Sequence, residues 1–258
     1  MARSTFYYHL KRLDVSDGYD RIREDIKRIY EENRGWYGYR RITFALRNSG
    51  IQINHKTVQK LMHQMYLSGR RQKQHYHSYK GEVGVVAPNI IDRNFKSDKP
   101  YKKMTTDVSQ VTIKDAKMFF SPLLDMYNGE IITYTITDRP DLHMVTDMMN
   151  QALREITIPD SCMIHSDQGW HYQHKRYQKL LKDNGITQSM SRKGNCLDNA
   201  IMENFFGIMK SELLYSHKWE SLEQFKTALR EYVNYYNNKR IKLRLNGLSP
   251  VQYRTQNM

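Results

Sequence analysis

The order of strand-like and helix-like segments after Tyr101 constrains the fold of this chain more than any other feature. Residues 102–113 and 117–127 have the pattern of strands, a polar turn at 114–116 separates them, and Asn128-Gly129 is a strong hairpin signal. A third strand follows at 130–137, and helices then alternate with short strands. Three antiparallel strands followed by this alternation predict a mixed α/β domain.

The later segments are predicted from hydrophobic periodicity and from turn residues. Helices are expected at 144–156, 171–184, 197–213 and 221–237, and strands at 161–164 and 186–190. Together with the first three strands they predict an α/β fold with a mixed five-stranded sheet and flanking helices. This order matches a ribonuclease H-like core.

The first part of the chain has a different, all-helical pattern. Helices are expected at 20–32, at 39–48 and from Asn54, a good N-cap, to about residue 65. The last two are joined by a turn, as in a helix-turn-helix, and the second would carry Lys56 and Lys60 on its outer face. A three-helix cluster that binds protein, or no partner, fits this pattern equally well. We therefore expect five regions: an N-terminal helical stub (1–18), a helix-turn-helix DNA-binding segment (19–67), a basic linker (68–100), the ribonuclease H-like core (101–240) and a C-terminal tail (241–258).

The charge of the chain indicates a polyanionic partner. The 258 residues include 41 Lys and Arg against 27 Asp and Glu, a formal charge of +14. Residues 1–100 carry 20 basic and 10 acidic side chains, and residues 101–258 carry 21 and 17. Such an excess, concentrated in a helical arm, is typical of a segment that contacts nucleic-acid phosphates.

Three acidic residues in separate elements are the candidate catalytic and metal-binding residues. Asp107 lies in the first predicted strand, Asp167 ends a short apolar run, and Glu203 lies in a predicted helix, with 35 residues between the last two. If folding gathers them, three carboxylates can hold two Mg²⁺ ions, the arrangement that cuts and joins phosphodiester bonds. Each acid alone fits a solvated surface position.

Basic side chains near Glu203 are candidates for binding DNA phosphate. Lys210 lies two helical turns after Glu203, on the same face, although a plain surface lysine is the alternative. Arg192 and Lys193 lie in the loop SRKGNCLDN before that helix, and a mobile basic loop beside an active site often closes on substrate. A solvated turn is the alternative for this loop.

The neighbours of Asp167 are less specific. Gly169 is expected to permit the turn that follows this acid. Three side chains are candidates for DNA contact: His165, Gln168 and Trp170. For Trp170, packing is the favoured role.

The remaining features of the sequence fit a cytoplasmic protein. Neither Cys162 nor Cys196 belongs to a CxxC pair, so no disulfide framework or zinc ribbon is expected. The N-terminus lacks the apolar stretch of a signal peptide, and no apolar run approaches the length of a membrane span. We expect a cytoplasmic protein without a membrane partner.

Longer motifs identify a family. The segments TTDVS, HSDQG, SMSRKGNCLDNAIMENFFGIMKSE and YVNYYNNKR resemble the DDE transposases of the IS3 family of insertion sequences, which have an integrase-type core. The stretch GWYGYRRITFALRNSGIQINHKTVQKLM resembles the helix-turn-helix segment that precedes that core in the family. The resemblance runs from about residue 19 to 254. One departure is Lys103-Met104, where the family often has Trp shortly before the first Asp.

The resemblance carries functional implications. It implies that Asp107, Asp167 and Glu203 are the metal-binding triad, that two Mg²⁺ ions are the cofactors with Mn²⁺ as a substitute, and that the DNA partners are terminal inverted repeats and target DNA. It implies a copy-out, paste-in route and a homo-oligomer on DNA. Family members are commonly made as a frameshift fusion, so an upstream-frame protein is an expected fusion partner, and this chain is expected to be the downstream-frame product.

Two other functions remain open at this point. A DNA-binding regulator would occupy element ends without cutting, and it would bind in the presence of a chelator. A ribonuclease H-like nuclease would cut RNA–DNA hybrids without transferring strands.

Overall fold

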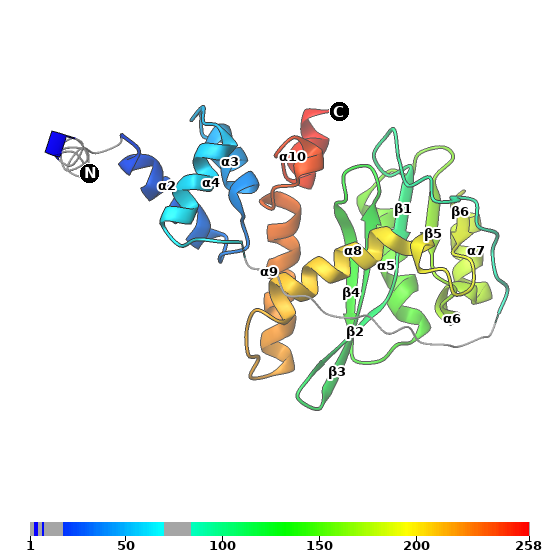
Figure 1. Cartoon of the computed structure of the whole chain (residues 1–258). Coiled ribbons are helices and arrows are strands. Elements are labelled where there is room, and N and C mark those ends of the chain that lie inside the picture. Colours follow the sequence, from blue (N-terminus) through cyan, green and yellow to red (C-terminus); the bar gives the residue numbers. More distant parts are fainter. Residues whose placement is uncertain (1–2, 5–6, 8–17, 70–83, 258) are drawn as a thin grey trace. The chain divides into compact units, whose positions relative to one another are not determined.

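The computed structural model describes residues 3–4, 7, 18–69 and 84–257. These residues form two compact units, one within 1–71 and 241–247 and the other within 72–240 and 248–258 (Figure 1). The predicted N-terminal stub falls almost wholly outside the described residues, and so does the first half of the predicted linker. The predicted tail contains a short 3₁₀ helix, η3 (Leu243–Leu245), and helix α10 (Pro250–Gln256).

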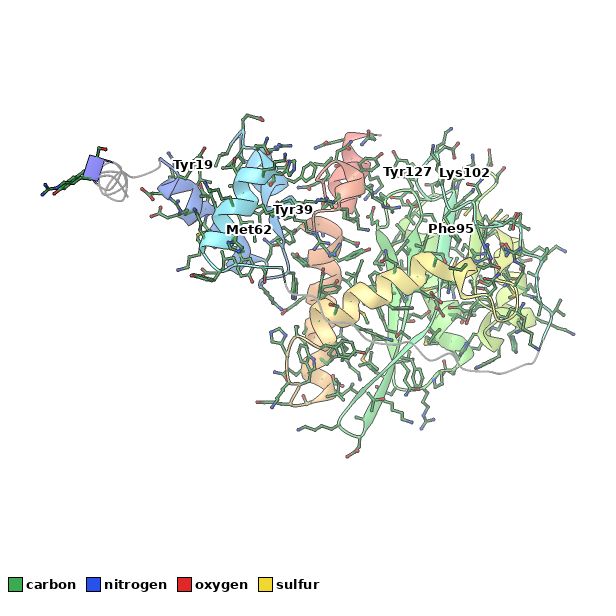
Figure 2. The ribbon with its side chains drawn as sticks, in the orientation of Figure 1. Tyr19, Tyr39, Met62, Phe95, Lys102 and Tyr127 are labelled. Atoms are coloured by element: carbon green, nitrogen blue, oxygen red, sulfur yellow. The ribbon has the colours of Figure 1, made fainter. Side chains whose placement is uncertain are left out.

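The N-terminal unit is a cluster of three helices. They are α2 (Asp20–Glu32), α3 (Tyr39–Asn48) and α4 (His55–Gln64), at the predicted places. Asn54 caps α4, because its side chain accepts a hydrogen bond from the N–H of Lys56 at 2.8 Å. Tyr39 and Met62 mark α3 and α4 in Figure 2. The apolar side chains at helical spacing meet in a core that includes Ile26, Ile42, Leu46, Val58, Leu61 and Met62.

The C-terminal segment of this unit is joined to the rest of it by hydrogen bonds between side chains and backbone. The N–H of Ile241 donates to the hydroxyl of Tyr37 at 2.9 Å, and the amide of Asn48 donates to the carbonyl of Gly247 at 3.0 Å. Gly247 has a positive φ of 83°, and an added Cβ would collide with the ring of Phe44. Glycine is therefore required at this position.

The second unit is built on one mixed sheet. Its strands are β1 (Lys103–Thr106), β2 (Ser109–Ile113), β3 (Ala116–Asp125), β4 (Ile131–Thr137), β5 (Met163–Ser166) and β6 (Thr187–Met190). β3 pairs antiparallel with β4 along one edge and with β1 and β2 along the other. β1 then pairs in parallel with β5, and β5 with β6. This is the predicted mixed arrangement.

The first predicted strand, at 102–113, is interrupted at Asp107. β1 and β2 keep the same antiparallel register with β3, and they are separated only by Asp107 and Val108. That register places Pro122 of β3 opposite Asp107. Proline has no N–H to donate to a ladder. The sheet therefore has six strands where five were predicted, and the difference is this break.

Helices cover both faces of the sheet. They are α5 (Leu142–Glu155), α6 (Trp170–Gln173), α7 (Lys175–Asp183), α8 (Ala200–Met209) and α9 (Leu222–Asn238). A 3₁₀ turn, η1 (Cys196–Asn199), leads into α8, and a π-helical turn, η2 (Lys210–Leu214), follows it. The predicted helices at 171–184 and 197–213 are thus each divided.

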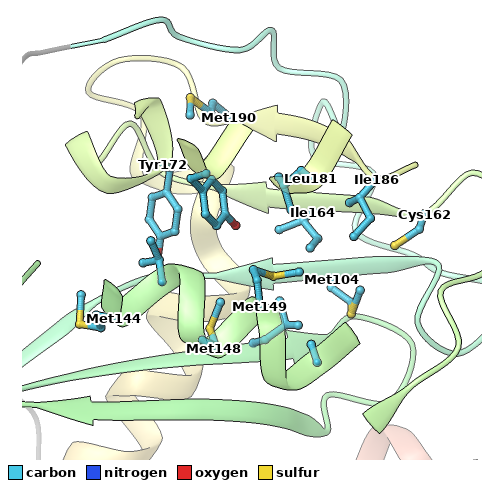
Figure 3. Packing of buried hydrophobic residues seen from close by; sticks show 14 residues of the cluster. Met104, Met144, Met148, Met149, Cys162, Ile164, Tyr172, Leu181, Ile186 and Met190 are labelled. Carbon is cyan, nitrogen blue, oxygen red and sulfur yellow. The ribbon is translucent and has the colours of Figure 1, made fainter. Parts of the chain in front are cut away.

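Two apolar layers hold the helices on the sheet. On one face, α5 and α7 pack in a methionine-rich cluster with Met104, Leu123 and Ile164 (Figure 3). On the other face, Phe120 lies against Phe205 of α8, with ring centroids 6.3 Å apart. Alternate residues of a strand point to opposite faces, which is why Leu123 and Phe120 enter different layers.

The described part of the predicted linker packs on this unit. The N–H groups of Ile90 and Ile91 donate to the hydroxyl of Ser189 at 3.0 and 3.2 Å, and Ile91 is buried. Pro88 accepts a hydrogen bond from the N–H of Met190 at 3.2 Å. Residues 84–100 therefore belong to the fold of the second unit.

Candidate active site

Two of the three predicted acids lie side by side because of the strand register. β1 and β5 are neighbouring parallel strands in which Thr105 pairs with His165. Asp107 and Asp167 each lie two residues further on, just beyond the carboxyl ends of these strands. Neighbouring strands are about 4.8 Å apart, so the two carboxylates begin from adjacent positions at one edge of the sheet.

Glu203 lies on a helix and not on a strand, in the first turn of α8. This helix contacts β1. Burial raises the pKa of Asp107 well above its ordinary value, and the negative charges of Asp167 and Glu203 raise this pKa further. The N–H of Val108 and the charge of Lys210 oppose that rise. The charges of both other acids therefore act on the carboxylate of Asp107.

The other two acids also sit in partly buried surroundings. Burial raises the pKa of Asp167, opposed by the N–H of Gly169, and burial raises the pKa of Glu203. Among the residues that the structure describes, no group of three or more His, Cys, Asp and Glu side chains is arranged to hold a metal ion. The acids share one region without closing around a common point.

The chemistry of this donor set suits a hard divalent cation. All three groups offer carboxylate oxygens, the ligands that Mg²⁺ prefers, and no sulfur ligand stands among them. Burial and mutual repulsion disfavour three ionised carboxylates, and a bound cation offsets both effects. The residues present therefore fit a divalent metal.

Gly169 gives Asp167 room. The N–H of Gly169 donates to Oδ1 of Asp167 at 2.8 Å. A Cβ on this glycine would lie 2.9 Å from the same oxygen, closer than real Cβ contacts come. Its φ of −57° is ordinary. The expectation that Gly169 serves the turn through its backbone freedom is thus corrected: the carboxylate requires the space.

A buried aspartate that sequence reasoning missed organises the loop before α8. Asp198 is fully buried, and it accepts hydrogen bonds from Arg192 at 2.8 and 2.9 Å, from Arg93 at 3.0 Å and from Asn89 at 2.8 Å. The hydrogen bond from Arg192 is the main cause that lowers the pKa of Asp198 below its ordinary value. The letters LDN in the loop motif were the only sequence signal for this residue.

The same loop is joined to β5. Nε2 of His165 lies 2.9 Å from the carbonyl oxygen of Asp198, and Nδ1 lies 3.0 Å from the hydroxyl of Ser189. A carbonyl oxygen only accepts, so Nε2 carries the proton. His165 is fully buried, and burial lowers its pKa. The prediction that it contacts DNA is therefore wrong.

The other predicted DNA-binding residues occupy different environments. Lys210 begins the π-helical turn, and burial lowers its pKa while the charge of Asp107 raises it. Arg192 is exposed but forms ion pairs with Asp198 and, at 3.3 Å, with Asp92. Lys56 and Lys60 are exposed on α4, and Lys193 is exposed in the loop before α8.

Two further candidates for DNA contact differ in exposure. The amide of Gln168 donates to the carbonyl of Ser191 at 2.9 Å, which ties it to the loop before α8. Trp170 is 41% exposed, and its ring lies 4.1 Å from that of His171.

Family models match most of the chain. Residues 19–75 match an HTH-like domain, and residues 97–196 and 203–258 match two integrase core domain models. No described helix has the length and apolar character that a membrane-crossing helix needs.

Curated relatives cover nearly all of the chain. The putative transposase InsK for insertion sequence element IS150 of Escherichia coli is 48% identical over 256 residues, which is 99% of this chain and 90% of that protein. An uncharacterized transposase-like protein of Haemophilus influenzae is 46% identical and covers 84% of this chain, over its own full length. The transposase for IS904 of Lactococcus lactis is 34% identical over 92% of this chain and 94% of that protein.

Among solved structures, the HTLV-2 integrase catalytic core domain in complex with magnesium is similar, with a TM-score of 0.49 and 17% identity, over 61% of this chain and 98% of that one. The family assignment rests on the curated relatives and on the domain models. The chain therefore belongs to the IS3 family of insertion-sequence transposases, as a DNA-binding polynucleotidyl transferase whose integrase-type core uses divalent metal ions.

Proposed function

We propose that Asp107, Asp167 and Glu203 are the catalytic residues of this transposase and that they hold two Mg²⁺ ions, for which Mn²⁺ can substitute. The observation that carries this proposal is the parallel register of β1 and β5, which brings the two aspartates to adjacent positions. The effect of Glu203 on the pKa of Asp107 supports the third assignment.

The reaction consists of two phosphodiester transfers. Water attacks a phosphodiester at the element end, which frees a 3′-hydroxyl, and that hydroxyl then attacks a second strand and displaces its 3′ oxygen. When bound, the two ions stabilise the attacking and leaving oxygens and offset the charge on phosphorus. The three carboxylates would hold these ions beside the reacting groups, and no covalent link to the protein is formed.

Five basic residues are proposed to hold DNA. We expect Lys210 to bind a phosphate beside the acids, and the effect of its charge on the pKa of Asp107 supports this assignment. Lys56 and Lys60 project from α4, the second helix of the helix-turn-helix, which is the element that enters the major groove in such motifs. Arg192 and Lys193 lie in the loop before α8 and are proposed to contact DNA from there.

The partners follow from the family. We propose that the donor DNA is the terminal inverted repeats of the element, that the protein acts as a homo-oligomer on DNA, and that an upstream-frame protein joins it as a fusion or as a partner. On this proposal the protein works in the bacterial cytoplasm at the nucleoid.

The test is a cleavage and strand-transfer assay on end DNA with Mg²⁺. Asp107→Asn, Asp167→Asn and Glu203→Gln should each lower both activities at least about a hundredfold, the size expected when a group that stabilises the transition state is removed. DNA binding should persist. The matched control is Asp183→Asn on the exposed face of α7, which should leave activity unchanged. Wild-type strand transfer in any of the three variants would show that its acid is not catalytic.

A further inference from the structure

Asn199 occupies a helix cap without using its side chain as a cap. It is the N-cap residue of α8, yet its side chain makes no capping hydrogen bond. Asparagine at this position usually stabilises a helix through that bond. Here the amide Nδ2 donates to Oδ2 of Asp107 at 3.0 Å, and Asn199 is only 6% exposed.

The orientation of this amide is set by its neighbours. A carboxylate only accepts hydrogen bonds, so the nitrogen of the amide has to face Asp107. The hydroxyl of Thr105 donates to the amide oxygen of Asn199 at 3.4 Å, a long bond that favours the same orientation. Thr105 is buried and lies on β1, two residues before Asp107.

Asp198, the residue before Asn199, is hydrogen-bonded to a second strand, β5. Asp198 is held by the guanidinium groups of Arg192 and Arg93, and its carbonyl oxygen accepts the Nε2–H of His165 on β5. His165 lies two residues before Asp167. The dipeptide Asp198-Asn199 is therefore bonded both to β5, the strand that precedes Asp167, and to Asp107 itself.

The third acid follows on the same helix. Glu203 is four residues after Asn199, and residues at this spacing lie on one face of a helix. The elements that carry the three acids thus meet at Asp198-Asn199. Few other described residues contact a predicted catalytic carboxylate directly; Val108 and Gly169 do so, through their backbones.

We propose that Asn199 is a positioning residue for the metal site: its amide orients the carboxylate of Asp107 toward a divalent cation shared with the other two acids. An amide suits this role because it is neutral. It donates to one lone pair of Oδ2 and leaves the charge of the carboxylate available, whereas Lys or Arg would compete with the cation. Hydrogen-bond partners of metal ligands commonly change metal affinity by about 10–100-fold.

This inference rests on the proposed metal site, so the experiment separates the two. Mn²⁺ alone, without DNA, is titrated against the full chain, and free Mn²⁺ is measured by electron paramagnetic resonance. Asp107→Asn tests the site. Asn199→Leu tests the inference, because leucine is of similar size but has no N–H. Asn184→Ala is the control, since that exposed amide donates only to its own helix, at Leu180.

The expected result is that Asn199→Leu weakens Mn²⁺ binding by about 10–100-fold. Thr105→Val, which removes only the hydroxyl behind the amide, should weaken binding less, and Asn184→Ala should bind as the wild type does. Thermal unfolding without metal reports folding separately. A purely structural role would lower the unfolding temperature of Asn199→Leu and leave the Mn²⁺ affinity of the folded protein unchanged.

Two results would overturn the inference. If Asp107→Asn loses Mn²⁺ binding while folded Asn199→Leu binds as the wild type does, Asn199 has no positioning role and the metal site stands. If Asp107→Asn itself binds like the wild type, the metal site is wrong and the inference falls with it. Should Asn199→Leu fail to fold, Thr105→Val decides, and unchanged affinity in that variant overturns the inference.

Discussion

Glu212 and Arg240 form a buried ion pair in the catalytic unit. The guanidinium donates to both carboxylate oxygens of Glu212, at 2.8 and 2.7 Å, and the two side chains are 10% and 3% exposed. The hydroxyl of Tyr232 also donates to Glu212 at 2.9 Å. This pair links the end of α9 to the π-helical turn that follows α8, the helix of Glu203.

Removing one partner of this pair should destabilise the protein strongly. Arg240→Met leaves the carboxylate of Glu212 buried without its cation, and such a loss costs about 3–5 kcal/mol in free energy of unfolding. The double variant with Glu212→Met should be less destabilised. Urea unfolding checks both, with Lys179→Met in an exposed pair as the control, where the expected change is below about 1 kcal/mol. Equal stability of Arg240→Met and wild type would mean that the pair is not buried.

Asp125 should make stability fall as pH rises through mild acid. Burial raises the pKa of Asp125 from 3.8 to about 6, although the N–H groups of Tyr101 and Tyr127 donate to it. The folded state therefore holds the proton more tightly than the unfolded state. Below about pH 4 the carboxyl is protonated in both states and does not lower the free energy of unfolding. Above pH 6 its ionisation lowers the free energy of unfolding by up to about 3 kcal/mol.

The variant that tests this is Asp125→Asn. Its free energy of unfolding, relative to wild type, should rise between pH 4 and pH 7, because only the wild type has a buried carboxyl that ionises and destabilises the folded state over this range. Urea unfolding at a series of pH values measures the difference. A difference that stays constant over this range would contradict the raised pKa.

Gly169→Ala should impair catalysis more than folding. The new Cβ would lie 2.9 Å from Oδ1 of Asp167, so the carboxylate has to move. Displacing a reacting group by about 1 Å commonly lowers the rate about a hundredfold. Strand transfer should therefore drop by this order, while the unfolding temperature changes little because φ of Gly169 suits alanine. Normal activity in this variant would show that the position of the Asp167 carboxylate is not critical.

Binding of the element end should depend steeply on salt through the helix-turn-helix. If Lys56 and Lys60 each contact a phosphate, replacing either by alanine should reduce the log–log salt slope on duplex DNA by about 0.9. Fluorescence anisotropy at several salt concentrations measures the slope. Lys179→Ala, on the exposed face of α7, serves as the control. An unchanged slope in the α4 variants would remove these lysines from the DNA contact.

Much of the fold could be predicted because the signals are local. Asn54 as a cap and the apolar spacing of α2, α3 and α4 gave the N-terminal helices their observed places. The hairpin signal Asn128-Gly129 and the β-branched run after it indicated β4. The family was readable from the long motif around Glu203, and the curated relatives confirm it. The roles of the three acids stay a prediction.

What could not be predicted depends on partners distant in sequence. The interruption at Asp107 involves Pro122 on another strand. The buried Asp198 is recognised only when Arg93, far along the chain, is seen beside it. Likewise, residues 84–100 have the composition of a linker, and their packing on Ser189 follows from the position of β6.

The most direct test of the central claim is anomalous diffraction from crystals of the protein with its end DNA and Mn²⁺. Two Mn²⁺ peaks about 3.5–4 Å apart should appear, with Asp107, Asp167 and Glu203 as their protein ligands. Peaks that lie away from these residues, or a Glu203 side chain turned away from both ions, would contradict the account.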